Sequence, residues 1–417
     1  MASLLPPEYD PPIAAEHWRE WGLRLRRGGG RPTVVVHGGY GKRNLGDDAI
    51  LEVLLAQLGE ALPGARVVVL CHGPEEVMAR HPVEAHHFAS RGALRAIWAA
   101  DLYIIGGGGI VNRINTYSGR RRWRVLDPKG KFLFLATLLA GARGARVIYH
   151  IIGATSVPDP LAGWLARVAM NRADEVTVRD PLSREVLSRL GVRRELRVLP
   201  DPALSLAAAP PEVAREILRR EGIDPDEPWV GINLRPVVEP DIDNAETAAT
   251  MGRLAEELAE TRRAQLVFLP FGLHPRIPAE NDLTMVEPLR AALRHPERLR
   301  VLRHPCTPPE MKALLAQMDF GILERLHAAI LAASAGAPFV ALDYDDKVAQ
   351  FVRAIGGEAR LIPLRGLRED QARATLAAAE KDSPPQRRGE RRENTMEERQ
   401  EGLPPASSSS APSAPPR

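Results

Sequence analysis

The sequence has few of the residues that build disulfide-bonded or metal-stabilised folds. Its 417 residues include two cysteines, Cys71 and Cys306, which stand far apart and form no C-x-x-C pair. This excludes a disulfide framework and a cysteine-based zinc site, and it fits a reducing compartment, so we expect a cytoplasmic protein. The histidines His81, His86 and His87 lack the spacing of metal ligands and are expected at the surface. Neither a metal nor a cofactor is expected.

Long apolar runs are also missing. No run of about 18 apolar residues occurs, which excludes a helix that spans a membrane. The first residues, MASLLPPEYDPP, show no basic segment followed by an apolar one, so no signal peptide is recognisable. Any membrane contact is therefore expected to be peripheral.

An excess of charge of one sign is absent as well. The chain has 56 basic and 53 acidic residues, a formal net charge of +3. So small an excess over this length does not indicate a protein that binds nucleic acid. The hydrophobic content of 44% is enough for real cores, and the length suits two domains with appendages.

What the sequence does have is a repeated alternation of short apolar segments and amphipathic ones. In the first half, strands are predicted over residues 34–36, 66–71, 102–105, 147–152, 175–179 and 196–199. In the second half, strands are predicted over residues 229–234, 265–269, 300–303, 320–323 and 338–342. Buried strands separated by helices indicate parallel sheets with helices on both faces.

We therefore predict an α/β protein of GT-B-like architecture. Two doubly wound parallel-sheet domains, residues 31–206 and 207–380, would face each other across a cleft. Residues 1–30 form a proline-rich extension with a short helix expected from His17 to Arg27. Residues 381–417 are rich in Pro, Ser, Arg and Glu, and we expect them to be a disordered tail.

The stretch Val34–Leu51, VVVHGGYGKRNLGDDAIL, joins a buried strand to a glycine-rich turn and a helix start. Helix N-termini favour anions, and glycines let a backbone approach a ligand closely. The order matches neither G-x-G-x-x-G nor G-x-x-x-x-G-K-[ST]. The simplest interpretation is a tight turn with Asp47 as the helix N-cap. The residues expected to face a ligand in addition are Gly39, Gly41, Asn44, Gly46 and Asp47, with Gly107 and Gly108 after a neighbouring strand.

Several motifs along the chain, taken in order, resemble those of the polysaccharide pyruvyl transferase family. Gly38–Leu51 resembles GYYGxGNLGDExxL, and the segment that begins with Arg325-Leu326-His327 resembles RLHxxIxAxxxGxP. Further segments match ADLVIxGGG at 101–109, RDxxSxxxLxxLGV at 179–192, D-P-A at 201–203, VGxxLRP at 231–236 and xYDxK at 344–347. The sequence departs from the family pattern at Asn112 and Arg113, where many relatives carry an acidic residue, and at Glu324, where they often carry a small residue or methionine.

The resemblance implies an enzyme that moves the enolpyruvyl unit of phosphoenolpyruvate onto two hydroxyls of a sugar. The product would be a pyruvate ketal of a cell-surface polysaccharide or its precursor, with phosphate released and phosphoenolpyruvate as the co-substrate. His327 is the candidate general acid, since imidazole titrates near neutrality. Arg325 and then Arg235 are the first candidates to bind the anionic donor, with Arg179 and Lys347 as further ones. The glycine-rich loop would face the acceptor sugar, which is expected to be lipid-linked or nucleotide-linked.

Several of these residues also have a structural interpretation. Asp47 or Asp180 would orient acceptor hydroxyls or act as a base, but Arg179-Asp180 also reads as a helix N-cap with a neighbouring ion pair. Asp201-Pro202 reads as a turn, because the residue before proline is held extended. The basic run Arg120–Arg124 (RRRWR) is either a solvated loop or a contact for an acidic polymer or anionic lipid.

Two other functions remain open. A GT-B glycosyltransferase would use a nucleotide sugar and an acidic residue for the ribose, for which Glu324 or Asp343 is available. A non-catalytic binding protein of the same fold would not need His327 or Arg325.

Overall fold

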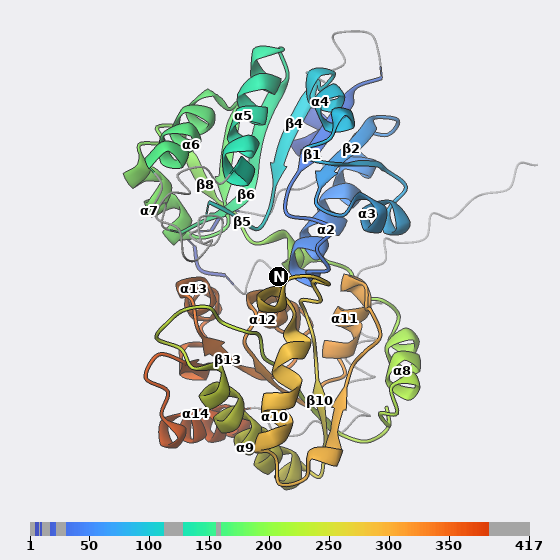
Figure 1. Ribbon diagram of the computed structural model, residues 1–417, viewed down its shortest axis with the longest axis vertical. Helices are drawn as coiled ribbons and strands as arrows, with labels where there is room; N and C mark the ends of the chain where they lie inside the picture. The colour runs from blue at the N-terminus through green and yellow to red at the C-terminus, as the bar shows by residue number, and fades with distance from the viewer. Residues whose placement is uncertain are drawn as a thin grey trace, which may run out of the picture.

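The computed structural model describes residues 5–7, 9–10, 17–21, 31–111, 128–155 and 160–382. The basic run Arg120–Arg124, the departures at Asn112 and Arg113, and the predicted tail beyond residue 382 lie outside these residues. Figure 1 shows two α/β units, one above the other. Among the described residues, none of the helices combines the length and the apolar character needed to cross a bilayer.

The N-terminal domain is built on a parallel sheet whose strand order is β3-β2-β1-β4-β6-β7-β8, with β5 paired to β6. The strands are β1 (Thr33–His37), β2 (Arg66–Cys71), β3 (Glu84–His87), β4 (Leu102–Gly106), β5 (Gly109–Val111), β6 (Arg146–Ala154), β7 (Glu175–Val178) and β8 (Leu196–Val198). The helices are α2 (Leu45–Ala61), α3 (Pro74–Arg80), α4 (Arg91–Trp98), α5 (Pro128–Ala142), α6 (Pro160–Arg172) and α7 (Pro181–Leu190), followed by the 3-10 turn η4 (Pro202–Ser205).

The C-terminal domain has a parallel sheet of order β11-β10-β9-β12-β13-β14. Its strands are β9 (Trp229–Asn233), β10 (Gln265–Phe268), β11 (Leu299–Val301), β12 (Phe320–Leu323), β13 (Phe339–Asp343) and β14 (Leu361–Pro363). Its helices are α8 (Pro211–Arg220), α9 (Asn244–Arg262), α10 (Val286–Ala292), α11 (Pro308–Leu315), α12 (Leu326–Ser334), α13 (Asp346–Ala354) and α14 (Glu369–Lys381). The order is that of a Rossmann sheet, in which ligands bind at the carboxyl ends of the strands.

The prediction of two doubly wound parallel sheets is therefore confirmed. Neighbouring residues of a strand point to opposite faces, which explains the continuous apolar runs. In β1, Val34 and Val36 pack into a core cluster with α2, whereas Val35 packs into a separate cluster with α4, α5 and α6. Trp18 and Trp21, 0% and 6% exposed, pack into the cluster on the α2 side. Within the predicted helix from His17 to Arg27, the described helical residues are 17–21.

Some elements were not predicted. The sequence of β3, EAHH, places His86 and His87 on an edge strand, where polar side chains are tolerated and the apolar pattern is lost. Strands β5 and β14 have three residues each, too few to show a period. Helices α3, α10 and α14 were missed as well.

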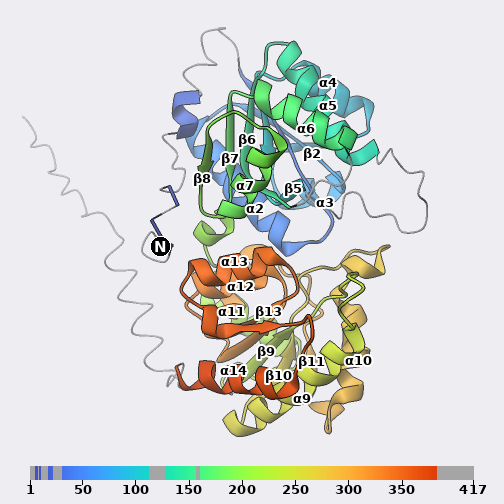
Figure 2. The ribbon, with the colours of Figure 1, turned by 90° about the vertical axis from the view of Figure 1, so that its left-hand side faces the viewer.

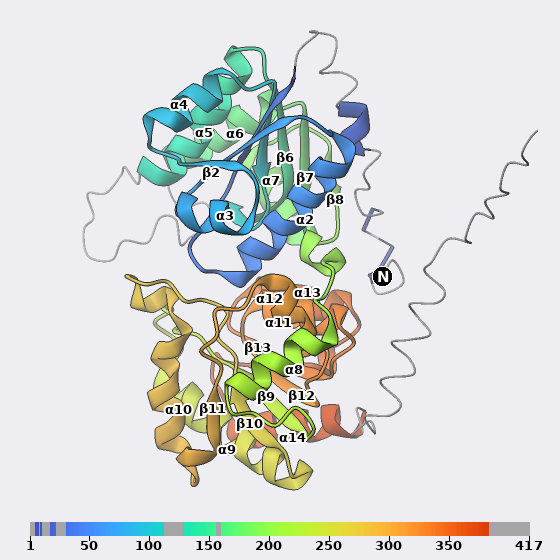
Figure 3. The same ribbon diagram turned by 90° about the vertical axis from the view of Figure 1, so that its right-hand side faces the viewer.

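Helix α2 joins the two domains. Its residues Leu51, Leu54 and Leu58 belong to the core of the N-terminal domain. Leu45 and Ala49, by contrast, pack into the core cluster of the C-terminal domain. Figures 2 and 3 show α2 at the junction, close to α12 and α11. A helix that is apolar on both sides is therefore explained by two partners, one on each side.

Candidate active site

The glycine-rich loop ends at a helix cap that differs from the predicted one. Asn44, not Asp47, is the N-cap of α2, and its Oδ1 accepts a hydrogen bond from the Gly46 N–H at 3.1 Å. Its Nδ2 donates to Asp47 Oδ2 at 3.0 Å. The cap lies three residues earlier than predicted. The Asp47 carboxylate therefore does not cap the start of the helix and lies beside the glycine-rich loop instead.

Two glycines leave room for that carboxylate. A Cβ built at Gly108, whose φ is +77°, would lie 2.7 Å from Asp47 Oδ1, and one built at Gly39 would lie 3.4 Å from Oδ2. The glycine tract after β4 and the loop after β1 therefore meet at Asp47. Burial raises the pKa of Asp47, while the positive charges of His327 and Lys42 act in the opposite direction.

The same loop forms backbone contacts with the C-terminal domain. The Leu45 N–H donates to the Phe271 carbonyl at 2.9 Å, and the Leu273 N–H donates to the Arg43 carbonyl at 2.9 Å. Arg43 has a φ of +56°, which is rare for a residue with a Cβ. The start of α2 is thus fixed directly against the facing domain.

His327 stands in the first turn of α12 and touches the first turn of α2. A Cβ at Gly46 would lie only 2.2 Å from His327 Nδ1, so the imidazole occupies the space that any larger residue would need. Gly46 and His327, which the sequence assigned to opposite walls of the cleft, are therefore brought into contact across it.

The other side of the imidazole faces Asp201. His327 Nε2 lies 3.5 Å from Asp201 Oδ2, and both atoms are buried without a hydrogen-bond partner. Asp201 Oδ1 accepts from the Ala203 N–H at 3.0 Å, so the predicted turn is present as well. Burial opposes ionisation of Asp201, but the charges of His327 and Arg179 outweigh it and lower its pKa. Sequence reasoning missed this contact with His327.

Arg325 is held by a buried carboxylate. Its Nε lies 2.9 and 2.8 Å from the two oxygens of Asp282, and its Nη2 lies 2.5 Å from Oδ1. Asp282 is 0% exposed, and its Oδ2 also accepts from the N–H groups of Phe271 and Gly272. The pair fixes the guanidinium in place. Asp282 lies in the 3-10 turn η6 (Asp282–Met285), and no motif pointed to it.

Arg235 follows β9 and lies against Tyr344. Its Nη1 donates to the Tyr344 hydroxyl at 3.1 Å, and its backbone N–H donates to Glu324 Oε2 at 2.9 Å. Glu324 is 0% exposed, and burial raises its pKa to about 8 despite this hydrogen bond. Lys347 Nζ lies 5.2 Å from the centroid of the Tyr344 ring and 2.9 Å from Asp345 Oδ2.

Arg179 is placed by an irregularity in β6. Ile151 has a φ of +51°, and the register between β6 and β7 shifts there. The Thr177 hydroxyl accepts from the displaced Ile151 N–H at 2.8 Å. Just beyond, the Arg179 guanidinium lies on Gly153, where a Cβ would be 2.7 Å from Cζ. Asp180 caps α7 and accepts from Arg179 Nε at 3.1 Å, so the predicted cap and ion pair are confirmed.

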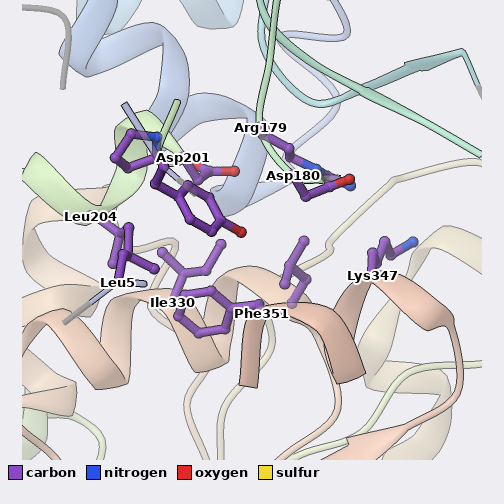
Figure 4. A pocket seen from close by; sticks show the side chains of 11 residues that line it. Leu5, Arg179, Asp180, Asp201, Leu204, Ile330, Lys347 and Phe351 are labelled. Carbon is purple, nitrogen blue, oxygen red and sulfur yellow. Dashed lines mark hydrogen bonds and ion pairs between the residues drawn. The ribbon is translucent and has the colours of Figure 1, made fainter. Parts of the chain in front are cut away.

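A pocket between the domains shares several of these residues. Arg179, Asp180 and Asp201 of the N-terminal domain face Lys347 of the C-terminal domain (Figure 4). Leu5, Tyr9, Leu204, Leu326, Ile330 and Phe351 form its apolar walls. The charged side chains from the two domains thus converge on one place at the junction.

Within the described ranges, one group of side chains has metal-ligating atoms close together. His304, Cys306 and Glu310 place these atoms within 4.8 Å of one another. Glu310, however, accepts from the Thr307 N–H at 2.7 Å in a capping box that starts α11. Burial raises the pKa of the Cys306 thiol to about 12. These contacts support a structural role.

Solved structures confirm the fold. A putative UDP-N-acetylglucosamine 2-epimerase from Listeria monocytogenes aligns with a TM-score of 0.55 at 13% identity, covering 84% of this chain and 88% of that one. The UDP-GlcNAc 2-epimerase of Methanocaldococcus jannaschii, in complex with UDP-GlcNAc and UDP, gives 0.53 at 11% identity, covering 89% and 100%. At these identities the likeness shows a GT-B-like fold and nothing about the reaction.

Comparison of sequences gives a more specific result. The family model described as polysaccharide pyruvyl transferase matches residues 44–346. A search of curated proteins found no match. The matched range runs from the Asn44 cap, through Asp201 and Arg235, to the start of α13.

Proposed function

The chain belongs to the polysaccharide pyruvyl transferase family, and on that premise we propose that it forms pyruvate ketals on a sugar. Membership makes it a transferase of polysaccharide biosynthesis. The proposed reaction takes the enolpyruvyl unit from phosphoenolpyruvate, joins it to two hydroxyls of one sugar and releases phosphate, in the assembly of a cell-surface polysaccharide. The observation that carries this proposal is the position of His327, between Asp201 and Gly46 at the junction of the two domains.

The first step needs a proton on the methylene carbon of the donor. His327 is the candidate to give it, and the Asp201 carboxylate, 3.5 Å from Nε2, would orient the ring. Protonation leaves C2 electron-poor, and the first hydroxyl adds there and loses its proton. The second hydroxyl then displaces phosphate and also loses its proton. One of the two protons replaces that given to the methylene, and the other leaves with phosphate or enters solvent.

The donor carries a phosphate and a carboxylate. Arg325 and Arg235 lie on the same wall as His327. The Arg325 guanidinium is held by the buried Asp282 carboxylate, and the Arg235 guanidinium donates to the Tyr344 hydroxyl. Guanidinium groups fixed in this way bind planar anions without a large loss of side-chain entropy, and they also stabilise the leaving phosphate. Arg179 and Lys347, which line the interdomain pocket, supply further positive charge.

Asp47 is the candidate base for the acceptor hydroxyl. Its carboxylate lies against the glycine backbone of Gly39 and Gly108, where a ligand is able to approach closely. Its raised pKa brings the carboxylate closer to the working pH of a general base. The loop and the tract would then bind the acceptor, lipid-linked or nucleotide-linked, while the C-terminal wall binds the donor.

The nucleotide-sugar alternative loses one of its two candidate residues. A ribose-binding carboxylate has to be reachable, but Glu324 is 0% exposed and its Oε2 is engaged by the Arg235 N–H. Asp343 remains partly exposed at the end of β13. A glycosyltransferase reaction would therefore have to rely on Asp343 or on a residue without an acidic group.

The test is a release assay with two donors. Incubation with phosphoenolpyruvate and a panel of sugar acceptors is expected to release phosphate, and incubation with nucleotide sugars is expected to release no nucleotide. His295→Gln is a suitable control for substitutions of His327, because His295 is an exposed histidine of the same domain. Release of nucleotide from nucleotide sugars, with no release of phosphate from phosphoenolpyruvate in the presence of any acceptor, would replace the proposal by a glycosyltransferase function.

A further inference from the structure

Exposed large apolar side chains are concentrated on three helices of the N-terminal domain. Trp98 and Trp164 are 56% and 51% exposed. The full set on α4, α5 and α6 is Leu94, Trp98, Leu135, Leu161 and Trp164, which we call the tryptophan face. Elsewhere in the described chain, the exposed large apolar residues are Met78, Val238 and Ile277, each on a different element or loop. A cluster of this kind marks an interaction site more often than scattered exposed residues do.

The three helices form one continuous surface. Figures 2 and 3 show α4, α5 and α6 side by side over one face of the N-terminal sheet. The guanidinium of Arg143, just after α5, stacks 3.9 Å from the centroid of the Trp98 ring on α4. The face therefore combines aromatic and cationic groups in direct contact.

The charge of this surface is unlike that of the rest of the chain. The helices have 8, 15 and 13 residues, and none of these is Asp or Glu. With 53 acidic residues among 417, about four or five would be expected in segments of this length. The exposed arginines on these helices and directly after α5 are Arg91, Arg95, Arg143, Arg167 and Arg172, and Asp101, three positions after α4, is an exposed acidic residue beside them.

We propose that the tryptophan face docks the protein onto the surface of an anionic lipid bilayer. Tryptophan and leucine insert at the boundary between headgroups and acyl chains, and arginines contact the lipid phosphates. A second copy of the chain fits less well, because in a symmetric contact the three helices themselves offer no Asp or Glu to pair with the arginines. Nucleic acid would satisfy the arginines but not the exposed leucines.

The face reaches the edge of the sheet where the active site lies. Strand β6 ends at Ala154 and α6 begins at Pro160, so Leu161 and Trp164 lie in the first turns that follow the carboxyl edge. A docked molecule would hold the cleft near the bilayer. This would suit a lipid-linked acceptor, an inference that rests on the proposed function.

The test uses the full-length protein and unilamellar vesicles without any substrate. Vesicles of phosphatidylcholine with about one third phosphatidylglycerol are expected to carry the protein upward in a flotation gradient, and binding should weaken as salt is raised. Vesicles of phosphatidylcholine alone should bind it less. The double variant Trp98→Ser with Trp164→Ser is expected to bind anionic vesicles about tenfold more weakly. The double variant Arg91→Gln with Arg95→Gln should weaken binding to anionic vesicles and leave binding to phosphatidylcholine vesicles unchanged.

Matched controls are Met78→Ser and Ile277→Ser, which remove exposed apolar side chains outside the face and should leave flotation unchanged. Thermal unfolding of every variant checks that the fold is intact. Failure of the wild-type protein to float with anionic vesicles, or equal losses in the control variants, would overturn the proposal. If the wild-type protein is a dimer and the tryptophan substitutions make it monomeric, the face is assigned to contact with a second copy instead. Since no donor or acceptor is present, failure here is distinguishable from failure of the proposed reaction.

Discussion

The two walls of the cleft present different chemical groups. The part of the N-terminal wall around Asp47 consists of glycine backbone, with Gly39 and Gly108 lying against the carboxylate, while Arg179, Asp180 and Asp201 line the interdomain pocket. The C-terminal wall consists of charged side chains, of which Arg325 is paired with the buried Asp282. The difference indicates that the first wall supplies shape and close approach, and the second supplies charge.

The walls depend on each other at one point. His327 belongs to the charged wall, but it lies on Gly46 of the glycine wall and faces Asp201 at the end of the N-terminal domain. The position of the His327 ring is therefore constrained by residues of the domain that does not carry it. Substitutions on either wall should reveal which property each one contributes.

The largest effect is expected on the charged wall. His327→Gln keeps the size of the side chain but removes the titratable group, so kcat should fall about 10²–10⁴-fold. Initial rates of phosphate release measure this, with His295→Gln as the control at an exposed histidine. A His327→Gln enzyme with unchanged kcat would remove His327 from the chemistry.

The next effect tests shape on the glycine wall. Gly46→Ala places a methyl group where His327 Nδ1 now lies 2.2 Å away, so the ring has to move. Displacing a catalytic group in this way costs roughly 10²-fold in rate. Gly59→Ala in the same helix is the matched control, since nothing lies within 4 Å of its added Cβ. Equal rates in the two variants would show that the contact does not position the ring.

A smaller loss is expected at Asp201. Asp201→Asn keeps an oxygen for the Ala203 N–H but removes the charge that faces His327. We expect kcat to fall about tenfold with KM little changed, because the carboxylate that faces the ring is lost. Asp243→Asn, which changes a capping aspartate of α9, controls for loss of a cap. A kcat equal to that of wild type would assign Asp201 to the turn alone.

The smallest effect on activity, with a clear effect on stability, is expected at Glu324. Its folded-state pKa of about 8 lies above the usual 4.5, so the protonated form is favoured by folding. That contribution is complete below pH 4.5 and is lost as the pH rises through about 8. Glu324→Gln should therefore match wild type at acidic pH and exceed its unfolding free energy by on the order of 5 kcal/mol above pH 8. Denaturant titrations across this range measure it, and a constant difference would contradict the buried protonated carboxyl.

The fold was largely predictable because it depends on local patterns. Buried parallel strands such as Arg66–Cys71 are continuous apolar runs, and the residues after them mark one edge of the sheet. The edge strand β3 was missed because two of its four residues are histidines. The cap of α2 was misplaced because Asn44 and Asp47 are equally good capping residues three positions apart.

The site was predictable only where it is local in sequence. Arg325 and His327 are two residues apart, so one motif contains both. The partners that fix them, Asp282 and Asp201, come from distant segments and resemble ordinary turn residues. Folding of the C-terminal domain brings Asp282 to Arg325, and packing of the two domains brings Asp201 to His327. No spacing in the sequence records either contact.

The proposed reaction begins when the cleft protonates the methylene carbon of phosphoenolpyruvate. The most direct measurement is a reaction run in D₂O, with mass spectrometry and NMR of the sugar product. The account predicts a pyruvate ketal whose methyl group carries one deuterium, formed together with phosphate. A product without that deuterium, or a glycosyl product formed from a nucleotide sugar with no phosphate released from phosphoenolpyruvate, would contradict it.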